Sequence, residues 1–487
     1  MPIPVLTVEQ MRQWEAASWA AGRSQEDVIA RAGGAVARVA TGLTRAGDSI
    51  LVLAGRGHNG DDARQAARQL PQRKVKLIEV GDPAATARAL PELLEEGPAL
   101  IIDGLFGIGL NRPLDEAWVE IIRVLNASRV PILAVDVPSG LDAATGQPMP
   151  VAIEAAVTVT LGAPKAGLLA SSAWPYVGRL EVARDIGLLP CPLKAEKIWT
   201  MATDFAAFPP PRHVADHKGS HGHLAIVAGS VGFHGAAVLA ARGAQRAQPG
   251  LITLCVPETI YVPVAARLES VMVRPWRGEP ELPQATALVA GPGLAGPEVD
   301  SRLREFVRRA WREWPGAMIV DASALDWLEP GAVRVAAPRV LTPHPGEAAR
   351  LLGISTAAVQ GDRLSALRKL SAQWGGAWVV LKGHQTLIGC REGEVAVNSS
   401  GNPHLAQGGS GDLLAGFLGG LLAQPRLQRE VSLALRYAVW RHGTAADCLS
   451  ARCSSWTVEE LADELGAPRP DGENASLGPE PSAIHPV

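Results

Sequence analysis

QGGSGDLLAGFLGGLL, residues 407–422, joins a glycine-rich turn to an apolar predicted helix that carries an acid, Asp412, on its first turn. Backbone N–H groups at a helix N-terminus favour negative charge, and glycines let a phosphate group approach the backbone closely. A carboxylate would repel phosphate, so we expect Asp412 to accept a proton from a hydroxyl or to hold a metal ion between phosphates. The alternative is an ordinary glycine-rich turn in which Asp412 is only a helix-start residue.

The length and composition limit the class of protein. With 487 residues the chain is too long for one core, and two or three domains are expected. A formal net charge of -3 gives no broad basic field for nucleic acid or an anionic membrane. No apolar run reaches the about 18 residues that span a bilayer, and the N-terminus lacks a signal-peptide pattern. The 5 cysteines show no metal-ligand spacing and indicate reduced thiols in a cytoplasmic protein.

Apolar strand-like runs alternate with helical patterns along most of the chain. In the first half, strands are expected at residues 49–54, 75–80, 99–102 and 132–137, and helices at 61–70 and 116–126. A second series of strand-like runs begins after Gly222: HLAIVAGS, LITLCVP, ALVAGPG, AMIVDASAL and VVLKG. This alternation predicts an α/β fold with two α/β domains, each a mostly parallel sheet covered by helices.

The domain limits follow from changes in composition. Residues 186–214 are irregular and proline-rich, which predicts a junction near residue 205. The expected domains are residues 1–205 and 206–466, and residues 467–487 are expected to be a disordered tail because they have almost no large apolar side chains. Residues 7–24 are expected to form an amphipathic helix that packs on the first domain.

Residues that follow the strands are the candidates for a site, because open α/β sheets bind ligands outside the carboxyl ends of their strands. In the second half, small residues in VGFHGAA (231–237) suit either close ligand approach or tight helix–sheet packing. His344 is held in a non-helical loop between two prolines and is interpreted either as structural or as a site residue. Lys382 ends a strand before Gly383, where it suits a phosphate contact or is a solvated lysine.

The segments AGPG, VDASAL, TPHPGE, VLKG and GGSGD, in that order, resemble the carbohydrate-kinase-like family of ribokinase fold that dehydrates hydrated NAD(P)H. The resemblance covers residues 210–466. GGSGD alone also fits sugar, hydroxymethylpyrimidine and hydroxyethylthiazole kinases, whereas TPHPGE separates the repair enzymes from them. The resemblance implies that ADP, or ATP in some relatives, phosphorylates the added hydroxyl with Mg²⁺, after which phosphate leaves and the dihydropyridine is restored.

The same resemblance implies roles for individual residues. Asp412 is the catalytic base. The hydrate pocket is implied to contain Ala236, Gly293, His344 and Asp412. The nucleotide site is implied to contain Lys382, Gly383, His384, Gln385, Thr386 and Gly411.

Three strand ends in the first half each combine an acid or amide with glycines. They are GRGHNGDD (55–62), DGLFGIGL (103–110) and DVPSGLD (136–142). Asn59, Asp103 and the Ser139 region could supply hard oxygen ligands to a cation. The alternative is that the acids cap helices and the glycines form turns.

The segments VDVPSGLD, DGLFGIGL and APKAGLL resemble the Rossmann-like NAD(P)H-hydrate epimerase domain, over residues 1–205. The resemblance implies a K⁺ site at Asn59, Asp103 and Ser139, with Asp136 as a catalytic residue at the reacting carbon. The implied hydrate-binding residues are His58, Asn59, Gly60, Asp61, Asp62, Gly107, Ile108, Gly109, Leu110, Asn111, Arg112, Pro113 and Asp136. The family's glycine loop usually reads G-x-G-N-N-G-G-D-G, from which this chain departs at His58, Asp61 and Ala63.

Taken together, these resemblances predict a bifunctional repair enzyme in which one domain epimerises R and S hydrates and the other dehydrates only the S form. Two alternatives stay open. The chain is a small-molecule kinase regulated by its first domain, or the first domain is a non-catalytic binding module beside a working dehydratase. The expected partners are small-molecule substrates, with no nucleic acid and no membrane, and the chain is expected to form a homo-oligomer.

Overall fold

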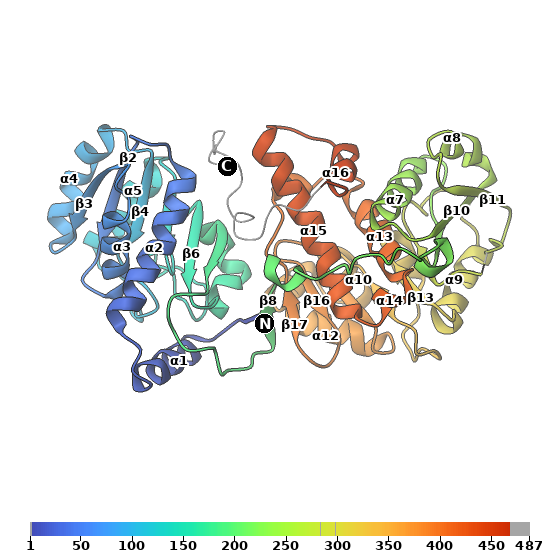
Figure 1. Ribbon diagram of the computed structural model, residues 1–487, viewed down its shortest axis with the longest axis horizontal. Helices are drawn as coiled ribbons and strands as arrows, with labels where there is room; N and C mark the ends of the chain where they lie inside the picture. The colour runs from blue at the N-terminus through green and yellow to red at the C-terminus, as the bar shows by residue number, and fades with distance from the viewer. Residues whose placement is uncertain (1, 283, 298, 468–487) are drawn as a thin grey trace. The chain divides into compact units, whose positions relative to one another are not determined.

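The structure, a computed structural model, describes residues 2–467 except residues 283 and 298 (Figure 1). The chain divides into two compact units, residues 3–199 and residues 200–467. Of the tail expected at residues 467–487, only Ala467 belongs to the described residues. No helix in the described part of the chain is both long enough and apolar enough to cross a membrane.

The first unit contains a wholly parallel sheet. Its strands are β2 (Ser49–Ala54), β3 (Lys74–Glu79), β4 (Leu100–Gly104), β5 (Ile132–Val135), β6 (Val157–Leu161) and β7 (Arg179–Ala183). They lie in the order β3-β2-β4-β5-β6-β7, and every neighbouring pair is parallel. The expected parallel sheet is therefore confirmed, although β6 and β7 were not among the expected strands.

Helices cover both faces of this sheet (Figure 1). Side chains of α2 (Gln25–Leu43) and α3 (His58–Arg68) share one core with Val52 and Ile102. Side chains of α4 (Pro83–Glu95) and α5 (Glu116–Ala127) share the other core with Leu51 and Ile101. The alternation along β2 and β4 follows from the period of 2 in a strand, which sends successive side chains to opposite faces.

The expected amphipathic helix at the start of the chain is confirmed as α1 (Val8–Ala20). Its buried side chains Met11 and Trp14 pack against Gly162 at the end of β6, where a Cβ atom would lie 3.0 Å from the Met11 side chain.

The helix α2, which follows, was not predicted. Its buried face consists mainly of small residues, so it lacks the large apolar side chains that mark a helix in sequence.

The stretch at residues 186–214, expected to be irregular, contains a strand. β8 (Lys197–Trp199) pairs antiparallel with β1 (Ile3–Pro4) at the start of the chain. The expectation was wrong for these residues because the pairing joins segments nearly the whole domain apart in sequence, which no local pattern reveals. Short apolar runs acquire strand structure only when a partner edge is present.

The second unit contains a larger, mixed sheet. Its strands lie in the order β17-β16-β15-β14-β13-β12-β9-β10-β11. The bounds are β9 (His223–Val227), β10 (Leu251–Pro257), β11 (Met272–Trp276), β12 (Ala287–Ala290), β13 (Ala317–Val320), β14 (Arg339–Leu341), β15 (Trp378–Leu381), β16 (Leu387–Gly389) and β17 (Val395–Val397). β16 is antiparallel to both neighbours, and the strands from β15 to β11 are parallel.

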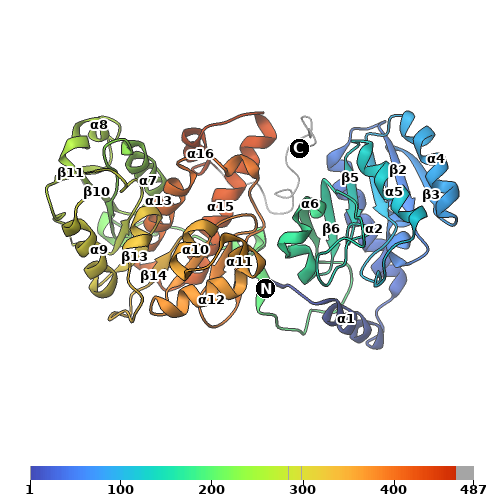
Figure 2. The ribbon, with the colours of Figure 1, turned by 180° about the vertical axis from the view of Figure 1, so that it is seen from behind.

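Helices also flank this second sheet. α7 (His234–Ala247), α13 (Ser410–Leu422) and α15 (Val431–Arg452) are seen on one side in Figure 1. α10 (Pro345–Leu352) and α12 (Arg363–Gln373) are seen from the other side in Figure 2. The remaining helices are α6 (Trp174–Val177) in the first unit, and α8 (Tyr261–Ala265), α9 (Ser301–Glu313), α11 (Thr356–Gly361), α14 (Pro425–Gln428) and α16 (Val458–Glu464). Short 3-10 helices span Ala166–Leu169, Ser171–Ala173, Ala202–Phe205, Lys218–His221, Glu258–Ile260, Ala322–Trp327 and Pro403–Leu405.

Each sheet has a point where the direction of strand addition reverses. In the first sheet the chain leaves β2 for β3 on one side, and β4 then lies on the other side of β2. In the second sheet β10 and β12 lie on opposite sides of β9. Ligands of open α/β sheets bind outside the carboxyl ends of strands at such reversals, so the loops after β2, β4, β9 and β12 are the expected site loops.

Candidate active sites

The glycine-rich turn at 407–412 opens α13 as the sequence predicted. Gly409 precedes the helix with φ 97°, a left-handed conformation that glycine adopts readily. A Cβ atom on Gly409 would also lie 2.4 Å from the Leu239 side chain of α7. The turn therefore requires glycine at this position, and it leaves Asp412 in the first turn of the helix with the free N–H groups.

Three other charged side chains come together with Asp412. Asp321 follows β13 and Lys382 follows β15, and Lys382 Nζ lies 2.7 Å from Asp321 Oδ1. Glu347 on α10 lies 3.9 Å from the same ammonium group. A Cβ atom on Gly411 would lie 3.5 Å from Lys382 Nζ, so the ammonium group faces the start of α13. Residues separated by up to 91 positions in sequence thus form one charged cluster.

Burial and neighbouring carboxylates change the acidity of Asp412. Burial is the main cause that raises the pKa of Asp412 to about 7, and Asp321 and Glu347 raise it further while Lys382 lowers it. A carboxylate with a pKa near 7 is well matched to accept a proton at neutral pH. Burial lowers the pKa of Lys382, but the carboxylates of Asp321 and Glu347 outweigh it, so the pKa is raised and the ammonium stays charged.

Two residues expected in the hydrate pocket, Ala236 and Gly293, lie side by side at the reversal point of the second sheet. Gly293 has φ 65°, and a Cβ atom there would lie 2.7 Å from the Ala236 Cβ. The loops are tied together by Ser230, whose hydroxyl donates to the Gly293 carbonyl at 2.6 Å. Tight packing also contributes, because a Cβ atom on Gly229 would lie 2.9 Å from Ala237. The tight-packing interpretation of VGFHGAA is therefore confirmed at Ala236 and Ala237, and close ligand approach at this segment stays a prediction.

His344 has a structural role that can be seen directly. It is the N-cap of α10, and its Nδ1 accepts hydrogen bonds from the N–H groups of Gly346 at 3.0 Å and Glu347 at 3.3 Å. Since Nδ1 accepts these hydrogen bonds, the ring proton lies on Nε2. That side of the half-exposed ring lies 3.5 Å from Glu347 Oε1, which connects His344 to the charged cluster.

The expected nucleotide loop, residues 382–386, forms a tight turn after β15. Gly383 has φ 128° and Gln385 has φ 52°, so two of its residues are in the left-handed region. The guanidinium group of Arg363 on α12 donates to the His384 carbonyl and to the Leu381 carbonyl. Thr386 closes the turn by donating its hydroxyl to the Gly383 carbonyl at 3.0 Å. These hydrogen bonds hold the loop in place, and its first residue, Lys382, belongs to the cluster at α13.

In the first domain, Asn59, Asp103 and Ser139 meet at the reversal between β2 and β4. Ser139 donates its hydroxyl to Asp103 Oδ1 at 2.6 Å and its N–H to Asp103 Oδ2 at 2.8 Å. Asn59 donates its amide to the Phe106 carbonyl at 2.8 Å, and the Phe106 N–H donates to Ser139 Oγ at 2.9 Å. Three segments distant in sequence thereby place several oxygen atoms around one wholly buried carboxylate.

Asp103 is buried without a cationic side chain in contact with it among the described residues. Burial raises its pKa to about 6, although hydrogen bonds from Ser139 and the Leu105 N–H oppose this effect. A buried carboxylate normally needs a compensating positive charge. The carboxylate, hydroxyl, amide and carbonyl oxygens in this cluster are the donors that hard monovalent or divalent cations prefer, so the residues fit the expected cation.

Asp136 is held in a strained conformation beside a buried lysine. Its φ of 63° is uncommon for a residue other than glycine, and such strain is found at functional sites. The Lys165 ammonium donates to Asp136 Oδ1, to Thr160 Oγ1 at 3.2 Å and to the Leu161 carbonyl at 2.9 Å. The Leu161 N–H also donates to Asp136 Oδ1 at 2.9 Å, so the carboxylate has a fixed orientation.

In the loop that departs from the family pattern, the extra acid, Asp61, is paired with neighbouring side chains. Asp61 accepts a hydrogen bond from Arg64 at 2.9 Å and lies 3.3 Å from His58 Nδ1. Ala63 is buried against Gly104, where a Cβ atom would lie 2.3 Å from the Ala63 Cβ. Asp62 is buried, and burial together with Asp136 and Asp61 raises its pKa to about 8. At neutral pH Asp62 is therefore mainly protonated.

The other expected binding segment, residues 107–113, follows β4. Gly107 lies against Asn59, since a Cβ atom there would be 3.3 Å from the Asn59 side chain. Arg12 of α1 donates to the Ile108 carbonyl at 3.3 Å, and the Leu110 N–H donates to the Gly107 carbonyl at 3.2 Å. Gly60 is fixed by close packing against the Gly55 carbonyl. Gly109, Asn111 and Arg112 are exposed and make no contact that links them to the Asp103 cluster in the described structure.

The sequence interpretation assigned no role to four residues that belong to these clusters. Asp321 and Glu347 lie beside Lys382, Thr342 donates to Asp321, and Lys165 holds Asp136. A signal was present for Asp321, which directly follows the strand AMIV as Asp103 and Asp136 follow theirs. Glu347 and Lys165 had no such signal, because a helix and a loop bring them to the strand ends.

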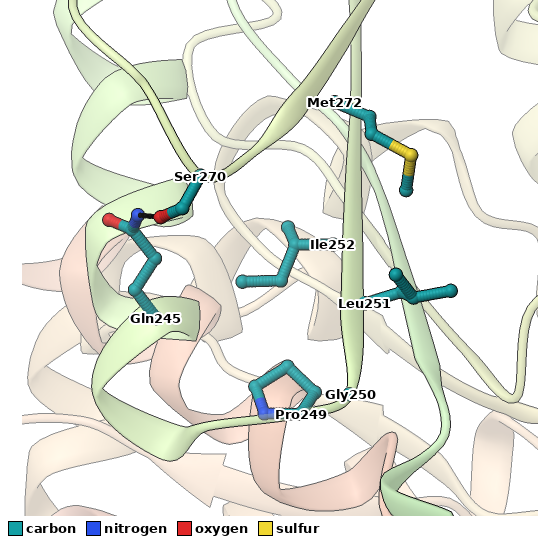
Figure 3. A pocket seen from close by; sticks show the side chains of 7 residues that line it. All are labelled: Gln245, Pro249, Gly250, Leu251, Ile252, Ser270 and Met272. Carbon is teal, nitrogen blue, oxygen red and sulfur yellow. Dashed lines mark hydrogen bonds between the residues drawn. The ribbon is translucent and has the colours of Figure 1, made fainter. Parts of the chain in front are cut away.

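A shallow surface pocket in the second domain is unrelated to these clusters (Figure 3). It has a volume of about 260 Å³ and is lined by the beginnings of β10 and β11 and the end of α7, including Gln245 and Ser270. It therefore lies at the amino ends of the strands, and it contains none of the expected site residues. Within the described residues, no three His, Cys, Asp or Glu side chains come together to hold a metal ion.

Both domains match known family models. Residues 224–466 match the model described as NAD(P)H-hydrate dehydratase. Residues 25–89 and 81–167 match the model described as YjeF-related protein N-terminus.

Similar proteins extend over nearly the whole chain. The bifunctional NAD(P)H-hydrate repair enzyme Nnr of Gloeobacter violaceus is 38% identical over 94% of this chain and 96% of that protein. The enzyme of the same name from Escherichia coli is 32% identical over 88% of this chain and 86% of that protein. Among solved structures, an ADP/ATP-dependent NAD(P)H-hydrate dehydratase from Bacillus subtilis, co-crystallised with ATP/Mg²⁺, is 30% identical and covers 53% of this chain and 91% of that chain, with a TM-score of 0.47.

Proposed function

Because the chain belongs to the family of bifunctional NAD(P)H-hydrate repair enzymes, we propose that it returns both epimers of hydrated NADH and NADPH to the intact cofactors. The first domain interconverts the R and S hydrates. The second domain removes water from the S hydrate at the expense of ADP, forming AMP and phosphate. Joining the two activities makes both products of damage available to a dehydratase that accepts only one of them.

The observation that carries the dehydratase assignment is the charged cluster at the start of α13. Asp412 lies in the first turn of this helix, with a pKa raised to about 7 chiefly by burial. Its neighbour Lys382 supplies a positive charge beside the same turn. A proton acceptor next to a site for negative charge is what transfer of a phosphoryl group to a hydroxyl requires.

The dehydration is proposed to run through a phosphate ester of the hydrate. Asp412 accepts the proton of the hydroxyl as that oxygen attacks the terminal phosphorus of ADP, and AMP leaves. The phosphate group then departs from the ring with its bonding electrons, which hydroxide would do poorly. The neighbouring ring carbon loses a proton to solvent, and the electron pair of that C–H bond restores the ring double bond. The free N–H groups of α13 and the Lys382 ammonium stabilise the negative charge that develops on the phosphate.

The nucleotide is proposed to enter as its Mg²⁺ complex, which is a substrate of the reaction. Mg²⁺ bound with nucleotides usually keeps several waters and takes few protein ligands besides the phosphates. The loop Gly383–Thr386 and Gly411 are the proposed nucleotide contacts. The rigidity of this loop, held by Arg363, supports such a role, because a fixed backbone presents its N–H groups without reorganising.

The epimerase site is proposed to use K⁺, held by Asn59, Asp103 and Ser139. The Asp103 carboxylate is wholly buried, and its hydrogen-bond partners within the described structure are neutral, which supports a cation at this point. When bound, the cation supplies positive charge that balances Asp103 and attracts the polar groups of the hydrate. Asp136 is the proposed catalytic residue at the reacting carbon. Its orientation by Lys165 and the Leu161 N–H supports that role, because a fixed carboxylate is ready to accept or return a proton.

The remaining proposals concern the protein as a whole. A cytoplasmic location is supported by its small-molecule chemistry and by five cysteines that are all free thiols. Self-association into a homo-oligomer stays a prediction.

One assay tests the proposed function. The purified protein is incubated with a mixture of R and S NADPH hydrates, Mg²⁺ and either ADP or ATP, and the dihydronicotinamide absorbance is followed. Full recovery supports both activities. If only the S fraction is recovered, apart from the R hydrate that epimerises slowly without a catalyst, the first domain has no epimerase activity. A stable phosphorylated hydrate with no return of absorbance would identify a kinase instead.

A further inference from the structure

We infer that Asp321, anchored by Thr342, is a positioning residue that holds the Lys382 ammonium in front of α13, and that this ion pair acts on the dehydration step and not on nucleotide affinity. The inference deepens the proposed dehydratase function and rests on it. It assigns a role to Asp321, which the proposed mechanism with Asp412 as the base does not use.

The first step of the argument is the geometry of three neighbouring strands. β13, β14 and β15 are adjacent and parallel, so Asp321, Thr342 and Lys382 follow their carboxyl ends in a row. The Thr342 hydroxyl donates to Asp321 Oδ1 at 2.7 Å, and Lys382 Nζ donates to the same oxygen at 2.7 Å. Asp321 is 1% exposed. The sheet backbone therefore determines where the carboxylate lies, and the carboxylate determines where the ammonium lies.

The second step is the close fit around the ammonium group. On one side it meets Asp321, and on another Glu347 lies 3.9 Å away. Gly411 is also close, since a Cβ atom there would be 3.5 Å from Nζ, so the first turn of α13 comes near the ammonium group. A lysine fixed in this way cannot follow a phosphate group by rotating its side chain. A pre-positioned charge at the reacting group stabilises the transition state more than the bound nucleotide.

The third step concerns the charges that face Asp412. They come from three other elements: Asp321 after β13, Lys382 after β15 and Glu347 on α10. His442 on α15 lies near Ser410, but burial lowers its pKa to about 4, so it is neutral at the pH of interest. Asp321 raises the pKa of Asp412 and Lys382 lowers it. Removing the two partners of one ion pair must therefore shift the pKa of Asp412 in opposite directions.

The experiment compares Asp321→Asn and Lys382→Met with the parent enzyme, with kcat and KM measured for ADP between pH 5 and 9. We expect kcat to fall by about 10²-fold in both variants, because Asp321→Asn displaces the ammonium group and Lys382→Met removes it. The KM for ADP should change little. The acid limb of the pH profile is the range in which kcat falls as the pH decreases. The midpoint of this limb should move to lower pH in Asp321→Asn and to higher pH in Lys382→Met, by about one pH unit for the loss of one nearby charge.

Two further variants make the test specific. Thr342→Val keeps every charge and removes only the anchoring hydroxyl, so kcat should fall with the acid limb unmoved. Asp463→Asn removes an exposed carboxylate paired with Arg246 far along the chain and should leave kcat unchanged. Circular dichroism and thermal unfolding show whether each variant is folded. A folded Asp321→Asn that fails to bind ADP in calorimetry would overturn the inference. If Asp321→Asn does not fold, the combination of Lys382→Met and Thr342→Val carries the test.

The outcomes separate this inference from the proposed function. If the parent restores no cofactor, the proposed function is wrong whatever the variants do. If the parent is active but neither charge variant moves the acid limb, Asp321 and Lys382 do not act on the dehydration step. A large rise in the KM for ADP with kcat unchanged would make Lys382 a nucleotide-affinity residue and would overturn the inference.

Discussion

At the scale of single residues, the same residue type acquires different properties from its surroundings. Asp62 and Asp103 are buried and Asp412 is half-buried. Loss of water contact is the main cause that raises the pKa of these acids, to about 8, 6 and 7 respectively. Asp61, next to Asp62 in sequence, is instead half-exposed and paired with Arg64. Chemistry at each site therefore depends on the packing that removes water from a carboxylate and on the charges placed beside it.

The first prediction at this scale concerns Asp412. Asp412→Asn keeps the size and polarity of the side chain but cannot accept a proton, so dehydratase kcat should fall by about 10²–10⁴-fold. Affinity for ADP should change little. In the parent, kcat should decrease as the pH falls through about 7, because the base acts only when deprotonated and its pKa is raised to about 7. Near-parent turnover of Asp412→Asn would exclude Asp412 as the base.

The second prediction separates the two roles of His344. The cap of α10 depends on Nδ1 as an acceptor, and an asparagine side chain can replace it, whereas alanine cannot. His344→Ala should destabilise the second domain by about 1 kcal/mol, and His344→Asn should not. Both should raise the KM for the hydrate more than the KM for ADP if the imidazole belongs to the hydrate pocket. The opposite pattern of KM changes would assign His344 to the nucleotide site.

At the scale of elements, α13 combines a ligand-facing start with a tightly packed body. Its first turn faces Lys382, while Gly416 packs directly against α7, where a Cβ atom would lie 1.8 Å from the Ala240 carbonyl oxygen. Gly243 of α7 packs against α13 in the same way, because a Cβ atom there would lie 2.0 Å from the Leu413 carbonyl oxygen. Close backbone contact between the two helices fixes the position of α13, and therefore of Asp412, relative to the sheet.

The third prediction tests this helix contact. Gly416→Ala should destabilise the second domain by about 1–3 kcal/mol, since overpacking forces the backbones of α7 and α13 apart. Thermal inactivation of the dehydratase should occur at a lower temperature, while the epimerase of the same chain serves as an internal reference and stays unchanged. Gly361→Ala is the matched control, because a Cβ atom at that helical position meets nothing within 4 Å. Equal stability of the two variants would contradict the assigned contact.

At the scale of the whole molecule, two α/β domains carry separate charged clusters, each at the carboxyl ends of its own parallel strands. The first cluster is built around Asp103 and Asp136, and the second around Asp412. Each domain contains the strands that position its own cluster, so the two activities should be separable by single substitutions.

The fourth prediction uses this separation to test the first domain. In an Asp412→Asn background, conversion of R to S hydrate should exceed the spontaneous rate, and Asp136→Ala should remove the excess. Asp61→Gly should have little effect, because Arg64 and His58 already bind the Asp61 carboxylate. The assay measures each epimer by chiral separation of the hydrates. If the Asp412→Asn parent shows no conversion above the spontaneous rate, but the added pair Asp61→Gly and His58→Asn produces such conversion, the natural first domain is a binding module without epimerase activity.

The sequence alone was sufficient for the parts of this protein that depend on local pattern. The alternation of apolar runs and helical patterns predicted two α/β domains. Acids and glycines at strand ends predicted which residues would gather in clusters, because parallel strands bring those ends to one edge. The glycine-rich start of α13 was also evident, since left-handed conformation and close packing both select glycine.

The tertiary structure alone decided which residues meet. The pairing of β1 with β8, the contact of Lys165 with Asp136 and the approach of Glu347 to Lys382 join segments far apart in sequence. It also decided how acidic each carboxyl group is, since the pKa of Asp412 depends on burial and on charges from three other elements. The physical reason is that desolvation and Coulomb interactions depend on distance in space, and the local sequence pattern does not contain those distances.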